Sequence, residues 1–253
     1  MNETKRILSF VRRAVDDYNM IEEGDRIAVG ISGGKDSLTL LAAMARLRLF
    51  YPKKFEVVGI TVDMGFEGSD YSAIETFCRD LNVEYKIVKT EIAKIIFDVR
   101  KESNPCSLCA KMRRGSLHAA AVEAGCNKVA LGHHYDDAVE TFMMNLFFEG
   151  RLGCFSPTSY LSNRKITLIR PMIYAQEKDV KYFTRRQNLP VLTSLCPEDH
   201  ATERENMKQL LKELEKGNEG LRHRIFHAMC KSNIDGFALH GKYPDAGAIP
   251  DEE

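Results

Sequence analysis

Six consecutive residues combine the side chains and the backbone freedom that binding of a phosphate group requires. They are Ser32, Gly33, Gly34, Lys35, Asp36 and Ser37. The two glycines allow a tight turn and a close approach of the backbone to a ligand. Amide groups at the start of a following helix point at an anion, the lysine adds a positive charge, and the serines add hydroxyl donors. We therefore predict a phosphate-binding loop.

This loop differs from the common nucleotide-binding motifs. A Walker A loop would need glycine at position 29 and Ser or Thr after the lysine, whereas the chain has Val29 and Asp36 there. Asp36 would repel a phosphate unless a cation lay between them, which indicates Mg²⁺. The alternative is a polar strand-to-helix turn that binds no ligand.

Cysteines form a second candidate site. Cys106 and Cys109 lie at a predicted helix start, and residues three apart share a helix face, so both sulfurs could bind one metal ion or cluster. Arg113 and Arg114 follow, and together with the helix N-terminus they should lower the pKa values of these thiols. Cys196, just before another predicted helix, is the natural third ligand.

The residues alone leave three interpretations of these cysteines open. An iron–sulfur cluster would use the three thiolates, zinc would add His200 as a fourth ligand, and a plain thiol pair would bind no metal. The remaining four cysteines are predicted to be structural; they are Cys78, Cys126, Cys154 and Cys230.

Strands that alternate with helices must position these groups. The expected strands cover residues 26–31, 55–62, 84–88, 128–131 and 165–169. This pattern predicts an α/β fold, a parallel five-stranded sheet flanked by helices on both faces. Ligands of such sheets bind beyond the carboxyl ends of the strands. Three polar clusters lie there: Ser32–Ser37, Asp63–Gly65 and Gly132–Asp137.

Length and composition set further limits. The 253 residues divide into an expected domain over 1–200 with an N-terminal helix, a helical extension over 201–240, and a flexible tail over 241–253. Thirty-six basic and thirty-six acidic side chains cancel, which excludes a polybasic nucleic-acid binder but not a local basic surface. The chain has no apolar run of membrane-spanning length and no secretory signal, so we expect a cytoplasmic protein with reduced cysteines and no membrane partner.

Several segments together resemble a known family. The SGGKDS loop is similar to that of the PP-loop ATP pyrophosphatases, which cleave ATP between the α and β phosphates. With PCSLCAKMRRG, LGHHYDDAVETFMMNLFFEG, IRPM and LCPEDH in this order, the chain resembles the tRNA 2-thiocytidine synthetases from about residue 27 to 200. It lacks the flanking CxxC modules of the related 2-thiouridine synthetases and is short at both ends for the thiocytidine branch.

The resemblance implies an activity and its cofactors. ATP would activate the oxygen on carbon 2 of a tRNA cytidine as an adenylate, and sulfur would then replace AMP. Gly33, Gly34, Lys35 and Ser37 would hold the leaving pyrophosphate. A [4Fe-4S] cluster with one free iron would be bound by Cys106, Cys109 and Cys196. The expected partners are tRNA, a sulfur donor (a cysteine desulfurase or sulfide) and, in a homodimer, a second copy.

The resemblance also places Gly132 and the two following aspartates at the nucleotide site. We assign Asp137 to activation chemistry or Mg²⁺ and Asp136 to capping or support, although either one could simply be a helix N-cap. Arg113 could stabilise charge as sulfur attacks. His133 and His134 are acid–base candidates, with a structural role as the alternative.

A local basic surface is the expected RNA contact. Residues 164–186 contain seven basic side chains against two acidic ones, which are Glu177 and Asp179. The basic residues are Arg164, Lys165, Arg170, Lys178, Lys181, Arg185 and Arg186, and Lys111, Arg113 and Arg114 add to them. A solvated helix face is the alternative. Competing functions are a lysidine-type ligase, which would not need the three cysteines, and a nucleotide sensor without catalysis.

Overall fold

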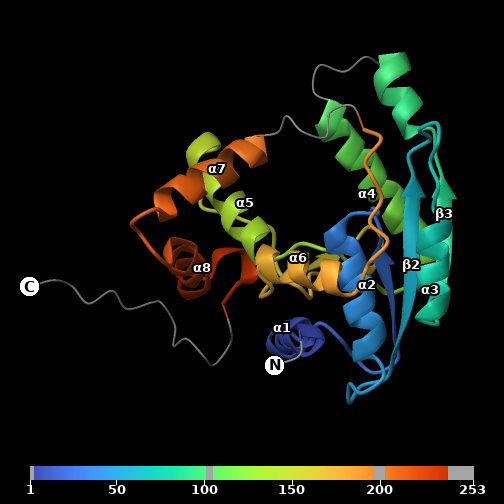
Figure 1. Cartoon of the computed structure of the whole chain (residues 1–253), viewed down its shortest axis with the longest axis horizontal. Coiled ribbons are helices and arrows are strands. Elements are labelled where there is room, and N and C mark those ends of the chain that lie inside the picture. Colours follow the sequence, from blue (N-terminus) through green and yellow to red (C-terminus); the bar gives the residue numbers. More distant parts are fainter. Residues whose placement is uncertain (1–2, 101–104, 197–202, 239–253) are drawn as a thin grey trace, which may run out of the picture.

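The computed structural model describes residues 3–100, 105–196 and 203–238 (Figure 1). One mixed sheet contains its strands in the order β3-β2-β1-β4-β6-β5. The strands are β1 Asp25–Gly30, β2 Phe55–Asp63, β3 Glu84–Lys89, β4 Lys128–Ala130, β5 Thr158–Leu161 and β6 Ile166–Ile169. All neighbours are parallel except β5, which pairs antiparallel with β6.

The predicted α/β fold is confirmed, but the prediction of five strands is wrong because the sheet has six. The additional strand is β5, a four-residue edge strand in which no residue is buried. Such a strand has neither the apolar run of a central strand nor a clear alternation, so the sequence pattern does not reveal it.

Helices flank the sheet on both faces. They are α1 Glu3–Asp17, α2 Lys35–Leu47, α3 Ser72–Asp80, α4 Pro105–Glu123, α5 Tyr135–Phe148, α6 Glu177–Arg186, α7 Glu203–Glu215 and α8 Leu221–Lys231, with a π-helix at Lys94–Arg100 and a 3₁₀ turn at Ile234–Gly236. Among the described residues, no helix has the length and apolar character needed to span a membrane.

Each face of the sheet has its own apolar core because β1 is buried on both sides. Ile27 and Val29 face a core built with α1, α2, α5 and α6. Ala28 faces a smaller core that includes Leu117 and Ala121 of α4. The sequence prediction of a buried first strand is therefore confirmed, and this double burial fixes the end of β1 where the phosphate loop begins.

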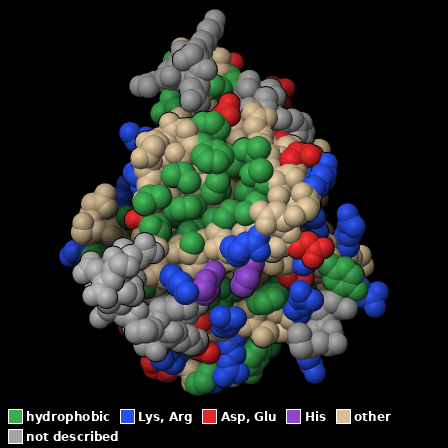
Figure 2. Space-filling model, turned by 90° about the vertical axis from the view of Figure 1, so that its left-hand side faces the viewer, with side chains coloured by type: hydrophobic (Ala, Val, Ile, Leu, Met, Phe, Trp, Pro, Cys, Tyr) green, Lys and Arg blue, Asp and Glu red, His purple; other side chains and the backbone are tan. Residues whose placement is uncertain are grey.

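Helices α7 and α8 lie within residues 201–240, pack against α5 and stand to one side of the sheet (Figure 1). Their face carries a broad apolar area above a band of histidine, lysine and arginine side chains (Figure 2). The exposed large apolar side chains of α5 and α7 are Leu146, Phe147, Phe148, Leu210 and Leu214. The expected tail, residues 241–253, lies outside the described residues.

Candidate active site at the carboxyl edge of the sheet

The three predicted polar clusters meet at one edge of the sheet. β1 leads into the Ser32–Ser37 loop, β2 ends at Asp63, and β4 is followed after Leu131 by Gly132. Because β2 and β4 are the two parallel neighbours of β1, their carboxyl ends flank the loop. The fold therefore brings the three predicted clusters to one edge of the sheet.

The phosphate loop is a tight turn closed by its own serines. Gly33 has φ +83°, a backbone conformation that favours glycine. The Ser32 and Ser37 hydroxyls lie 3.2 Å apart, and Ser37 Oγ donates to the Gly34 carbonyl at 2.9 Å. Gly34 is the N-cap residue of α2 and has no side chain that could accept hydrogen bonds from the first-turn amides. These amides therefore remain available to an anion.

Lys35 lies between two carboxylates. Its Nζ is 2.9 Å from Asp36 Oδ2 and 3.4 Å from Glu177 Oε1 of α6. Burial favours a lower pKa for Lys35, but the charges of Asp36 and Glu177 outweigh burial, and the pKa is raised. The lysine therefore stays positively charged at neutral pH, as phosphate binding requires.

Gly132 lies directly against the phosphate loop. A Cβ atom at this position would be 3.1 Å from both the Asp36 carbonyl carbon and the Ser37 nitrogen. The neighbouring atoms are backbone and cannot move aside easily, so any larger residue would displace the loop. Glycine at this position thus allows a close approach between the Gly132 backbone and the loop.

The structure revises the predicted cap of α5. His134 is the N-cap: its Nδ1 accepts from the Asp137 N–H at 3.3 Å, and Asp137 Oδ2 accepts from the His134 N–H at 2.8 Å. Both aspartates lie in the first turn, so the prediction that one of them is the N-cap is wrong. Asp136 instead accepts from the Glu177 N–H at 2.7 Å and pairs with Arg222 of α8 at 3.2 Å.

His133 is held in an apolar setting. Its ring lies 4.8 Å from the Phe155 ring, and its Nδ1 has no hydrogen-bond partner. Burial, helped by the Arg170 charge, lowers the pKa of His133 to about 4. The imidazole is therefore neutral at pH 7, which favours the structural alternative over a protonated general acid.

The cysteine site draws on two distant segments. Cys106 and Cys109 lie in the first turns of α4, and Cys196 lies ten residues after the end of α6. Leu192 brings the latter segment onto the phosphate loop, because its N–H donates to the Gly33 carbonyl at 3.0 Å. Cys106 is exposed, and the other two are partly exposed.

The Cys109 thiol lies within range of the charges of Arg113, Cys196 and Cys106. Burial raises the pKa of Cys109, Arg113 lowers it in part, and the charges of Cys196 and Cys106 raise it further. The prediction of a lowered pKa is therefore wrong for Cys109, because burial outweighs the arginine. Within the described residues, no three His, Cys, Asp or Glu side chains already converge at metal-ligand distances. The soft thiolate donors match an iron–sulfur cluster.

The four cysteines that were predicted to be structural are less exposed than Cys106. Cys78, Cys126 and Cys230 are buried, as expected for structural residues, and Cys154 is partly buried. His200, the fourth ligand of the zinc alternative, lies outside the described residues.

A charge network that the sequence analysis missed joins α7 and α8 to this edge. Glu140 is 3% exposed and lies 3.6 Å from Arg204 and 3.5 Å from Arg222. Lys208 pairs with Glu177 at 2.9 Å. Glu140 itself is a signal in the sequence, because a glutamate within the apolar pattern of α5 needs charged partners when it is buried.

Asp63, the last residue of β2, accepts two hydrogen bonds from neighbouring residues. Asp63 Oδ1 accepts from the Gly65 N–H at 3.0 Å and from the Tyr71 hydroxyl at 3.4 Å.

Arg170, expected on the RNA surface, is only 7% exposed, so that assignment is wrong. Its guanidinium lies 4.8 Å from the Phe155 ring, and burial lowers its pKa to about 10. The remaining six basic residues of the 164–186 group are exposed.

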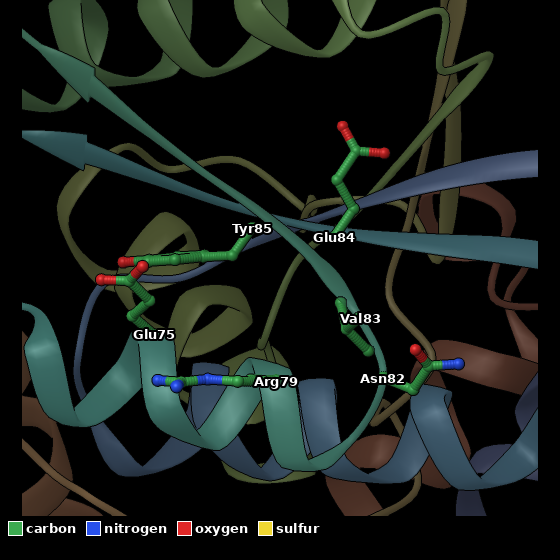
Figure 3. A pocket seen from close by; sticks show the side chains of 6 residues that line it. All are labelled: Glu75, Arg79, Asn82, Val83, Glu84 and Tyr85. Carbon is green, nitrogen blue, oxygen red and sulfur yellow. The ribbon is translucent and has the colours of Figure 1, made fainter.

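A separate pocket lies between α3 and the beginning of β3 (Figure 3). It is lined by Glu75, Arg79, Asn82, Val83, Glu84 and Tyr85. Glu84 is the first residue of β3, so the pocket lies toward the amino ends of the strands and contains none of the predicted site residues.

Comparison with known proteins identifies the family. Residues 4–215 match the PP-loop domain family. The tRNA-cytidine(32) 2-sulfurtransferase of Geotalea uraniireducens is 42% identical over 89% of this chain and 90% of the relative, and the enzyme of the same name from Syntrophotalea carbinolica is 40% identical over 89% and 88%.

A solved structure agrees with these relatives. The U34-tRNA thiolase NcsA from Methanococcus maripaludis, determined with its [4Fe-4S] cluster, has a TM-score of 0.72 and 26% identity, covering 87% of this chain and 76% of that one. The resemblance inferred from the sequence motifs is thus confirmed. The chain belongs to the PP-loop domain family and, within it, to the family of the tRNA-cytidine(32) 2-sulfurtransferases.

Proposed function

We propose that this protein is an ATP- and Mg²⁺-dependent tRNA sulfurtransferase that thiolates carbon 2 of a cytidine, with cytidine 32 as the target that its relatives' names give. One observation carries the proposal. The phosphate loop and the segment that leads to Cys196 are in contact through Gly33 and Leu192, and this contact supports an arrangement with nucleotide chemistry beside thiol chemistry. A ligase or a nucleotide sensor would need the loop but not the three cysteines.

The first half of the reaction uses the loop. Backbone amides at Gly33 and Gly34, with Lys35 and Ser37, bind the β and γ phosphates, while O2 of the cytidine attacks the α phosphate and pyrophosphate leaves. Asp36 is the best carboxylate for Mg²⁺, because its buried Oδ1 has no hydrogen-bond partner. When bound, Mg²⁺ would neutralise charge between this oxygen and the phosphates.

The second half uses the cysteine site. Cys106, Cys109 and Cys196 would hold the [4Fe-4S] cluster, which supplies an iron able to carry the incoming sulfur. Sulfur forms a bond to carbon 2 of the adenylated cytidine, and AMP leaves with the oxygen. Arg113, which is exposed one turn after Cys109, would stabilise the charge that develops on the base.

The partners beyond tRNA are also proposals. The sulfur comes from a cysteine desulfurase or from sulfide, and the protein works in the cytoplasm. A homodimer is proposed as well, and the exposed apolar side chains of α5 and α7 give it a candidate surface.

Release of pyrophosphate tests the enzymatic part of this proposal. Purified protein with ATP and Mg²⁺ should form AMP and pyrophosphate in amounts that depend on added unmodified tRNA. ATP binding without any tRNA-dependent pyrophosphate would instead identify a nucleotide sensor.

Asp137→Asn should lower the rate of thiolation by ~100-fold or more, the scale of a lost acid–base or charged group. The amide oxygen can still accept from the His134 N–H, so the capping box and the fold should persist. The measurement is thiolated cytidine per unit time, with iron content and melting temperature as controls. Full activity would leave Asp137 as a capping residue only and make Asp136 the better candidate.

Charge reversal at Arg185 and Arg186 should weaken tRNA binding by ~10-fold or more, because both side chains are exposed at the end of α6 and available to phosphates. Filter binding or calorimetry at several salt concentrations measures this effect. Removing residues 251–253, which include three acids, should change affinity little. An affinity that does not respond to salt would contradict the phosphate-contact account.

A further inference from the structure

We propose that Glu177 is a positioning residue that sets the direction of Lys35 in the phosphate loop, and that Lys208 of α7 supplies the charge that makes this arrangement compatible with ATP. The inference rests on the proposed use of ATP by this loop. It assigns a function to Glu177, the first residue of α6, and to α7 in the C-terminal part of the chain. Neither α6 nor α7 contains a residue that was predicted to bind the nucleotide.

Glu177 is held from several sides. Its own N–H donates to Asp136 Oδ2 at 2.7 Å, which fixes the backbone at the start of α6. Its carboxylate lies 3.4 Å from Lys35, 3.1 Å from Lys181 and 2.9 Å from Lys208. The side chain is 16% exposed. Glu177 is therefore a fixed acceptor rather than a mobile surface group.

The number of N–H donors on Lys35 explains why its contact with Glu177 matters for phosphate binding. An ammonium group has three N–H donors. Asp36 and Glu177 lie 2.9 Å and 3.4 Å from Lys35 Nζ and can take two of them, which leaves one for a phosphate oxygen. Asp36 is the adjacent residue and could not fix the direction alone, since its side chain and that of Lys35 leave the same turn of α2. Glu177 provides the second, independent point of attachment.

The charges around Glu177 explain how a carboxylate can lie so close to a triphosphate site. Alone, it would repel the phosphates. Three lysines share it, and burial is outweighed by Lys208, Lys181 and Lys35, so the pKa of Glu177 falls to about 2. Lys208 is the partner that does not belong to the loop or to α6. The packing of α7 thus reduces the net negative charge beside the phosphates of bound ATP.

Two variants should differ in their effect on ATP binding. In Glu177→Gln, Lys35 keeps its charge but loses a fixed direction, so turnover should fall by ~10-fold or more. The dissociation constant for ATP should stay within about 3-fold of wild type or become tighter, because a negative charge near the phosphates is gone. In Lys208→Met, Glu177 loses a counter-charge and ATP binding should weaken by about 3-fold or more.

Matched substitutions on α7 provide the controls. Glu213→Gln and Lys212→Met make the same chemical changes at exposed positions and should leave ATP binding and turnover at wild-type values. Calorimetry measures ATP binding, tRNA-dependent pyrophosphate release measures turnover, and melting temperature reports on folding.

Each outcome has a defined meaning. Wild-type turnover in Glu177→Gln would overturn the inference. Weaker ATP binding in both variants together with lower melting temperatures would also overturn it, because that pattern describes a structural ion pair. A wild-type protein that binds ATP but releases no pyrophosphate with tRNA would instead reject the proposed function. The difference in ATP affinity between the two variants would still test the placement of Glu177.

Discussion

The Lys35→Ala variant should lose tRNA thiolation by ~100-fold or more and bind ATP more weakly than the wild type. The physical reason is the loss of the one full positive charge that the loop itself contributes, at a position where charge develops on the leaving pyrophosphate. The fold should survive, because Glu177 retains Lys181 and Lys208 after Lys35 is removed.

Three measurements check this result: ATP binding by calorimetry, pyrophosphate release, and thiolated nucleoside by mass spectrometry. Lys212→Ala, an exposed lysine on α7, is the control for loss of a lysine elsewhere. Because the pKa of Lys35 is raised, its charge persists across neutral and mildly alkaline pH, and the wild-type rate should not fall there through this residue. ATP turnover at the wild-type rate in Lys35→Ala would remove the loop from the mechanism.

Protein purified anaerobically should carry about four irons per chain, and single alanine substitutions at Cys106, Cys109 or Cys196 should each remove the cluster and thiolation. A site with three protein ligands has none to spare, so each loss should be nearly complete. Absorbance and iron analysis measure the cluster, and pyrophosphate release shows whether the ATP half of the reaction continues without it.

Two buried cysteines serve as matched controls. Cys78→Ala and Cys230→Ala remove thiols from the apolar core and should keep iron and activity, with some loss of melting temperature. Stoichiometric zinc without iron in the wild type would contradict the cluster and favour a structural metal site.

The parts of the fold that repeat a strong local pattern were predictable from the sequence. β1, β2 and β4 are buried apolar strands, and each is followed by a turn rich in glycine or aspartate, so both the sheet and the edge that carries the site follow from periodicity. The edge strand β5 was not predictable, because it forms no continuous apolar segment.

Within the site, residue types were easier to predict than pairings. Asp136 and Asp137 were both singled out from the sequence, but which one bonds to the His134 amide depends on the backbone angle at the entry of α5. Arg170 counted as a surface charge in the sequence, whereas the Phe155 ring covers it in the fold. Long-range ion pairs such as Lys208 with Glu177 join segments that periodicity treats separately.

Mass spectrometry of nucleosides tests the central proposal most directly. Unmodified tRNA is incubated with anaerobically prepared protein, ATP, Mg²⁺ and sulfide, then digested to nucleosides. The account predicts 2-thiocytidine that forms only when ATP is present and that maps to position 32 when the tRNA is cleaved into fragments. An amino-acid adduct on cytidine, thiolated uridine, or unmodified cytidine from a protein with an intact cluster would contradict it.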